Sequence, residues 1–273
     1  AHHAEVCGIS PGSMTPFAHT LEEEGVVIYP VHLIRKGADC FEAIESLLTS
    51  APYPSRRDEE NLADLRAQLA ALKAGISGLR AVADGFGREA YLSYVREMLS
   101  FSEKAMENRI HSIGQNIRSG ICKLDDSDCV KVNIRAESGR LKIDFTGTSP
   151  VRADSLNANE AITRSALLYV LRLWLGDSVS MNEGVLKRVD LCLPESLISP
   201  VFYRDPKRCP AVVGGNVEIS QRIVDALMQA LELQAGSQAT MNNLIFGDEK
   251  KSYYETICGG SGAGPEYNGS DAI

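Results

Sequence analysis

Three blocks near the end of the chain combine amides, hydroxyls and glycines without a single Lys or Arg. They cover residues 211–220, 237–243 and 253–265. A solvated surface would carry more charge, and a core would be more aliphatic. Neutral polar groups beside bare backbone instead suit a pocket that binds a small polar ligand through directional hydrogen bonds.

The first block contains Gly214-Gly-Asn216 directly before an apolar periodicity that predicts a helix. Free backbone N–H groups at a helix start bind carboxylate or phosphate. The alternative is a tight turn followed by Asn216 as an ordinary N-cap. Glu218 and Gln221 lie one turn apart on the polar face of the same helix and favour the ligand interpretation.

The glycine run Gly259–Gly264 does not fit a nucleotide loop. A dinucleotide fingerprint from Gly260 would need a third glycine where Pro265 stands, and no Gly-Lys-Ser or Gly-Lys-Thr occurs in the sequence. A serine-hydrolase elbow around Ser261 fails at Ala263. Two interpretations stay open: a flexible loop after a strand, or a close approach of backbone to ligand that only glycine permits.

A His-x-x-Glu pattern at His2 and Glu5, beside His3, has residue types that ligate metal ions. Two such ligands need a third from elsewhere in the fold. The alternative is a disordered terminus without a metal.

Periodicity indicates which elements position these groups. A helix capped by Ser55 and a second one over about 88–115 form a long helical hairpin around Gly85-Phe-Gly87, which we interpret as scaffold or subunit interface. Residues 130–134 and 141–145 alternate as a β-hairpin with a turn at 137–140. Other expected elements are strands over 26–29, 31–34, 188–193, 244–246 and 253–257, and helices over 41–48, 161–175 and 217–233, the last with Gly236 just after its end.

The predicted fold class is α+β: a mixed β-sheet core with an inserted long helical hairpin, as a fragment of a larger fold. We expect a β-rich segment over 1–54, the hairpin over 55–120, and a mixed α/β portion over 121–273 that carries the three blocks. Together they make one incomplete catalytic domain.

Composition narrows the class of function. The chain has 273 residues, and its net charge of −8 argues against nucleic acid and anionic membranes as partners. Its longest apolar stretch, 166–175, is too short for a membrane span. Seven cysteines without a Cys-x-x-Cys pair, and no visible signal peptide, favour a reducing, cytoplasmic location.

Taken together, ordered blocks along nearly the whole chain resemble the hydantoinase B family, which includes the C-terminal part of ATP-dependent 5-oxoprolinase and large subunits of N-methylhydantoinases and ketone carboxylases. The matching blocks are the three described above and residues 2–14, 21–26, 51–56, 61–68, 144–148, 156–158 and 182–184.

The resemblance implies a cytoplasmic, oligomeric enzyme that opens a small cyclic amide, either 5-oxoproline or a hydantoin. It implies that a hydantoinase A-like partner subunit or domain binds the ATP, and that His2 and Glu5 help to hold a divalent metal such as Zn, Mn or Fe. The residue types then suggest Glu218 or Glu255 as general base. The candidate substrate-binding residues are Gly214, Gly215, Asn216, Gln221, Gln238, Asn242, Asn243, Gly259 and Gly260.

Several positions depart from the family pattern. Glu5 replaces an Asp, Cys7 replaces a Gly, and Asn159-Glu160 replace Pro-Arg. The family's upstream His/Asp segment and its downstream His-Thr-His segment are absent from this sequence. Two alternatives therefore stand beside the cyclic-amide hydrolase: a ketone carboxylase subunit of the same family, and a truncated, non-catalytic homologue that acts as a scaffold.

Overall fold

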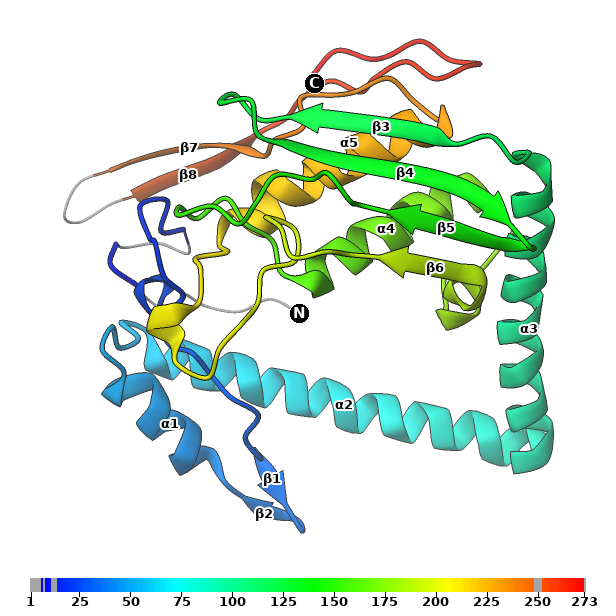
Figure 1. Ribbon diagram of the computed structural model, residues 1–273. Helices are drawn as coiled ribbons and strands as arrows, with labels where there is room; N and C mark the ends of the chain where they lie inside the picture. The colour runs from blue at the N-terminus through cyan, green and yellow to red at the C-terminus, as the bar shows by residue number, and fades with distance from the viewer. Residues whose placement is uncertain (1–5, 7, 11–13, 248–251, 273) are drawn as a thin grey trace. The chain divides into compact units, whose positions relative to one another are not determined.

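The computed structural model describes residues 6, 8–10, 14–247 and 252–272 (Figure 1). By its internal contacts the chain forms two compact units. Unit 1 comprises residues 1–96, 152–155 and 201–213, and unit 2 comprises the remainder. These units are made of discontinuous ranges that contact one another in space. The three continuous segments predicted from the sequence are a different division and stay a prediction.

Unit 1 holds a small apolar core beneath the start of its long helix. Phe41, Ile44 and Leu48 of the first helix pack with Val26 and Leu62. Its elements are η1 (Glu22–Glu24), β1 (Ile34–Arg35), β2 (Ala38–Asp39), α1 (Phe41–Ser50), α2 (Asp58–Phe86) and η3 (Pro206–Arg208).

Two sequence predictions fail in unit 1. Residues 26–33 contain no strand, and β1 and β2 form only a two-residue antiparallel pair. Pro30 has no N–H to give to a ladder and interrupts the apolar run. Ser55 does not cap α2, which begins at Asp58; its hydroxyl accepts a hydrogen bond from the Arg57 N–H at 3.1 Å instead.

Unit 2 is built on a four-stranded mixed sheet in the order β3-β4-β5-β6. β4 and β5 form the predicted antiparallel hairpin, and its turn places Ser138 and Gly139 at positive φ. β6 joins β5 in parallel. The elements are α3 (Arg88–Ser112, whose first residues belong to unit 1), β3 (Arg118–Lys123), β4 (Cys129–Glu137), β5 (Arg140–Asp144), α4 (Glu160–Leu175), η2 (Glu183–Arg188), β6 (Val189–Cys192), η4 (Gly215–Ile219), α5 (Ser220–Leu231), β7 (Asn242–Gly247) and β8 (Ser252–Ile257).

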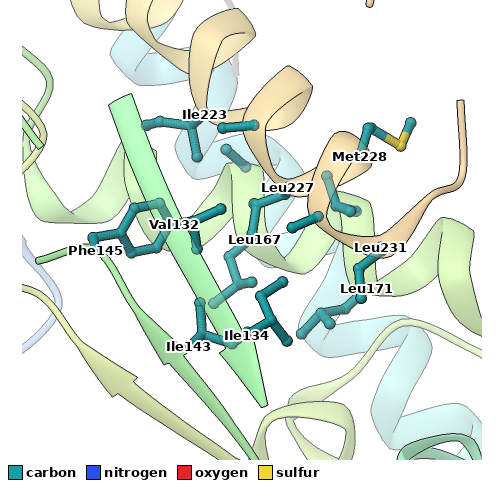
Figure 2. Close-up of a cluster of buried hydrophobic side chains, with 14 of the residues drawn as sticks. Val132, Ile134, Ile143, Phe145, Leu167, Leu171, Ile223, Leu227, Met228 and Leu231 are labelled. Carbon is teal, nitrogen blue, oxygen red and sulfur yellow. The ribbon is translucent and has the colours of Figure 1, made fainter. Parts of the chain in front are cut away.

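One face of this sheet packs against α4 and α5 to make the main core (Figures 1 and 2). Alternate residues of β4 and β5 are fully buried, as a strand with one covered face requires. Figure 2 shows them meeting the apolar side chains of the two helices. The labelled core residues are Val132, Ile134, Ile143, Phe145, Leu167, Leu171, Ile223, Leu227, Met228 and Leu231.

β3 was not predicted, because its sequence Arg-Ser-Gly-Ile-Cys-Lys lacks clear alternation. Gly120 explains the irregularity. A Cβ at this position would lie 1.9 Å from the Ala226 carbonyl oxygen of α5, so only glycine lets the helix backbone lie against the strand.

The α+β class with a mixed sheet and two consecutive long helices is confirmed. Those helices, α2 and α3, are joined at Gly87, whose φ of 81° favours glycine. Within the described part of the chain, no helix combines the length and the apolar character needed to cross a bilayer.

Candidate functional site

A π-helical turn leads into α5 and organises the candidate site. In η4 the Ser220 N–H donates to the Gly215 carbonyl, five residues back. Such turns are rare and are often found at functional sites. Gly215 makes the turn possible because a Cβ there would lie 2.8 Å from the Asn157 carbonyl oxygen and 2.9 Å from the Ala158 Cα.

The turn and α5 direct their polar side chains to two different cavities. Asn216 and Gln221 are five residues apart, so a turn with five-residue hydrogen bonding brings them to the same side. Glu218 and Arg222 are four residues apart and line the other cavity. Asn216 is not the N-cap that one interpretation expected, because Gly214 occupies that position without a side-chain cap.

The first cavity, which we call the amide pocket, has a volume of about 400 Å³ between α4, α5 and the segment that follows α5. Of the residues that the structure describes, no basic one lines it, and Asp225 is the only acidic one. Burial raises the pKa of the Asp225 carboxyl, opposed by the Ser237 backbone N–H and by Arg222. The lining residues are Ile162, Ser165, Ala166, Tyr169, Asn216, Ser220, Gln221, Val224, Asp225, Met228, Gln234, Ala235 and Ser237.

The second cavity, which we call the acidic groove, has a volume of about 650 Å³. Among the described residues, Arg222 is the only basic one in its lining, beside three carboxylates. The lining residues are Leu124, Asp125, Asp126, Leu156, Glu218, Ile219, Arg222, Gln238, Thr240 and Asn242.

The Glu218 carboxylate is held in this groove from two sides. The Thr240 hydroxyl donates a hydrogen bond to Glu218 Oε1. Arg222 Nη2 lies 3.9 Å from Glu218 Oε2. The Gln238 amide donates to the Thr240 carbonyl at 2.9 Å, and the Met241 N–H donates to the Val217 carbonyl at 3.0 Å. The segment 238–242 is therefore fixed to the π turn by its backbone as well as by Glu218.

The predicted substrate-binding residues thus do not all line the same cavity. Asn216 and Gln221 line the amide pocket, whereas Gln238 and Asn242 share the acidic groove with the candidate base Glu218. Sequence spacing gave no sign of this division, because a regular α-helix would have separated Asn216 from Gln221.

The other candidate base lies on a separate β-ribbon. β7 and β8 pair antiparallel, with Leu244 opposite Glu255 and Asn243 opposite Thr256. Glu255 is exposed and belongs to the lining of neither cavity. The side chain of Asn243 lies outside the described part of the structure.

The glycines of the third block make close contacts with the chain itself. A Cβ on Gly259 would lie 2.2 Å from the Gln238 side chain, and one on Gly260 would lie 2.6 Å from the Ser270 carbonyl oxygen. A Cβ on Gly262 would lie 2.0 Å from the Ala235 carbonyl oxygen. Packing of the C-terminal segment onto residues 235–238 accounts for Gly259 and Gly262, and packing within that segment accounts for Gly260, without a ligand.

The predicted metal ligands His2 and Glu5 lie outside the described residues. Within the described ranges, no group of three or more His, Cys, Asp or Glu side chains is placed to hold a metal ion. The divalent metal therefore stays a prediction from the resemblance.

Sequence reasoning missed one carboxyl group in unit 1. Glu24 Oε1 accepts hydrogen bonds of 2.6 Å from the backbone N–H groups of both Val212 and Val213. Burial raises its pKa from 4.5 to about 7, against the lowering effect of those two donors. Glu24 lies in one of the family-like blocks, but no local pattern reveals partners 188 and 189 residues away.

Comparison with known proteins gives consistent results. The family model described as hydantoinase B/oxoprolinase matches residues 1–273. The chain is 39% identical over 300 residues to 5-oxoprolinase 1 of Arabidopsis thaliana, covering 100% of this chain and 23% of that protein. It is 37% identical to 5-oxoprolinase of Saccharomyces cerevisiae, covering 97% of this chain and 22% of that protein. The chain thus spans less than a quarter of these relatives.

Two solved structures share the fold. An ATP-dependent caprolactamase from Pseudomonas jessenii superimposes with a TM-score of 0.80 at 21% identity, over 98% of this chain and 48% of its own. An acetone carboxylase in its nucleotide-free form superimposes with a TM-score of 0.74 at 16% identity, over 100% of this chain and 40% of its own.

Proposed function

Because the chain belongs to the hydantoinase B/oxoprolinase family, we propose that it is the hydantoinase B-like part of an ATP-dependent cyclic-amide hydrolase that opens 5-oxoproline. A hydantoinase A-like domain or subunit binds the ATP in this proposal, in keeping with the lack of a phosphate loop in the sequence. N-methylhydantoinase-type activity, with a hydantoin as substrate, is the finer alternative within the same reaction class.

The observation that carries the proposal is the position of Glu218 in the acidic groove. One of its oxygens accepts from Thr240, and the other faces Arg222. A general base must lie within hydrogen-bond reach of the proton that it removes. In this proposal Glu218 takes a proton from a water molecule that adds to the lactam carbonyl carbon. The C–N bond then breaks and the proton passes to the departing nitrogen, which yields a carboxylate and an amine.

Arg222 supplies the second element of recognition. 5-Oxoproline carries one carboxylate, and within the described part of the chain Arg222 is the only cation lining the groove. A guanidinium binds a carboxylate through two parallel hydrogen bonds. We assign the side-chain amides of Gln238 and Asn242 to the lactam N–H and carbonyl, since amides both donate and accept.

A bound divalent metal would supply Lewis-acid chemistry. His2 and Glu5 remain its proposed ligands, and their positions are not among those described. Metal analysis of the purified protein, with His2→Ala as the comparison, tests that assignment separately.

A substrate panel tests the proposed function. The full-length protein is co-produced with its hydantoinase A-like partner, and ADP release is measured with 5-oxoproline, hydantoin, or acetone plus bicarbonate. We expect 5-oxoproline to stimulate ADP release and to yield glutamate. ADP release only with acetone plus bicarbonate would identify a ketone carboxylase. No ADP release with any of the compounds would favour a non-catalytic scaffold.

A further inference from the structure

The helix α2 carries a continuous heptad repeat. Its apolar positions alternate in steps of three and four residues, which is the spacing that lets one helix pack along another. The eight positions are Leu62, Leu65, Leu69, Leu72, Ile76, Leu79, Ala83 and Phe86. We call this row the α2 seam.

Only the first half of the α2 seam is covered. Leu62 is buried, and Leu65 and Leu69 pack against the core that α1 forms in unit 1. Beyond them the side chains are exposed, by 62% for Leu72 and 58% for Leu79. Ile76 and Phe86 are exposed as well. Single exposed apolar residues are ordinary, but a row at heptad spacing marks an interaction surface.

One glycine beside the exposed half has no role in packing within the chain. Gly75 directly precedes Ile76 of the seam, and a Cβ on it would meet nothing within 4 Å. Glycine in a helix interior is destabilising relative to alanine. A small residue next to an apolar seam permits the close approach of another helix, which gives this destabilising residue a function.

The charged residues around the exposed half indicate which kind of helix would bind to the seam. Lys73 and Arg80 are the only charged residues between positions 67 and 83. They lie seven residues apart, so they occupy the same flank of the seam. The chain as a whole carries a net charge of −8, so this basic flank is a local exception.

A second copy of this chain does not supply the complement. In an antiparallel pair of α2 helices the basic flanks would face each other. In a parallel pair they would face positions 68, 75 and 82, which hold Gln, Gly and Val. Neither arrangement brings an acidic residue to Lys73 and Arg80, whereas such flanking positions set the choice of partner in helix pairs.

We propose that residues 72–86 of α2 bind an amphipathic helix of a partner polypeptide, with a Leu/Ile heptad seam flanked by acidic residues. The seam supplies the apolar contact, Gly75 permits close packing, and Lys73 and Arg80 select an acidic flank. This surface is independent of the acidic groove and of the proposed function.

Two synthetic helical peptides test the proposal. Both carry the same three-heptad Leu/Ile seam, with Glu at the flanking positions in one and Lys in the other. Binding of each labelled peptide to the protein is measured by fluorescence anisotropy. We expect the Glu peptide to bind more tightly than the Lys peptide by about threefold or more, since each exposed charge pair contributes modestly. Absence of binding, or equal binding of both, overturns the proposal.

Variants of α2 locate the binding surface. We expect Leu79→Asp to weaken binding of the Glu peptide by about tenfold or more. Ala74→Asp, on the opposite side of the helix, is the matched control and leaves binding unchanged. The double variant Lys73→Glu with Arg80→Glu keeps the seam and reverses the preference to the Lys peptide. Circular dichroism confirms folding, and a dimer in sedimentation that Leu79→Asp dissociates would overturn the proposal in favour of self-association.

Discussion

The acidic groove and the amide pocket lie on different sides of one helix and differ in what their polar groups can do. In the acidic groove three carboxylates, a guanidinium, a hydroxyl and two amides come together. With its described lining residues, the amide pocket collects hydroxyls and amides around a single carboxyl, Asp225, without a cation. Both cavities are lined by residues of the same π turn. They therefore show which of these neighbouring residues belong to the proposed chemistry and which only have a similar composition.

The largest effect is expected at Glu218. Replacing it by Gln keeps the size and the Thr240 contact but removes the base, so kcat for 5-oxoproline should fall by about 10²–10⁴-fold. Steady-state ADP and glutamate release measure the change. Glu255→Gln, on the exposed β-ribbon, is the matched control, and a larger loss there than at Glu218 would exchange the two assignments.

The next effect is expected at Arg222. Arg222→Gln should raise KM for 5-oxoproline by about tenfold or more, because a hydrogen bond to a charged group contributes roughly 1.5–3 kcal/mol. Hydantoin has no carboxylate, so its KM should change little. An equal rise for both substrates, or a loss of folded protein in thermal unfolding, would mean that Arg222 acts on the structure of the groove.

Glu24 binds the segment that leads into the shared π turn, through the backbone N–H groups of Val212 and Val213. Its folded pKa of about 7 lies above the ordinary 4.5, so the stability it contributes is complete below pH 4.5 and is lost as pH rises through 7. Glu24→Gln retains an oxygen for the Val212 and Val213 N–H groups. At pH 8 the variant should be more stable than the wild type by about 2–3 kcal/mol.

Denaturant unfolding at pH 4.5 and pH 8 measures this difference. The gap between the two proteins should close at the lower pH. A variant that is less stable than the wild type at pH 8 would show that the ionised carboxylate gains more from its two N–H donors than it loses by burial.

The smallest effect is expected in the amide pocket. Asp225→Asn should change kcat and KM for 5-oxoproline by no more than about twofold, because no reacting group contacts this pocket in our assignment. Since burial raises the pKa of Asp225, removal of its charge should not lower stability at neutral pH. A loss of activity comparable to that of Glu218→Gln would move the chemistry to this side of α5.

Local patterns predicted much of the fold that surrounds these cavities. Alternation identified β4 and β5, and apolar periodicity identified α4 and α5, because one covered face dictates each pattern. β3 escaped prediction because Gly120 is set by contact with α5, a tertiary requirement. α5 ends at Leu231 with Glu232 in the left-handed region, so Gly236 was the wrong terminator.

The site was predicted only in outline. The residue types of the three blocks indicated a polar site, but the π turn depends on packing of Gly215 against Asn157 and Ala158. The sequence does not reveal that contact, and so it does not reveal that Asn216 and Glu218 line different cavities. Contacts distant in sequence, such as that of Glu24 with Val212, are likewise outside the reach of local patterns.

A crystal structure of the full-length protein with 5-oxoproline tests the central claim most directly. The account predicts ligand density in the acidic groove, with the carboxylate against Arg222 and the lactam carbonyl within reach of Glu218. Density in the amide pocket beside Asn216 and Gln221, with the acidic groove empty, would contradict it.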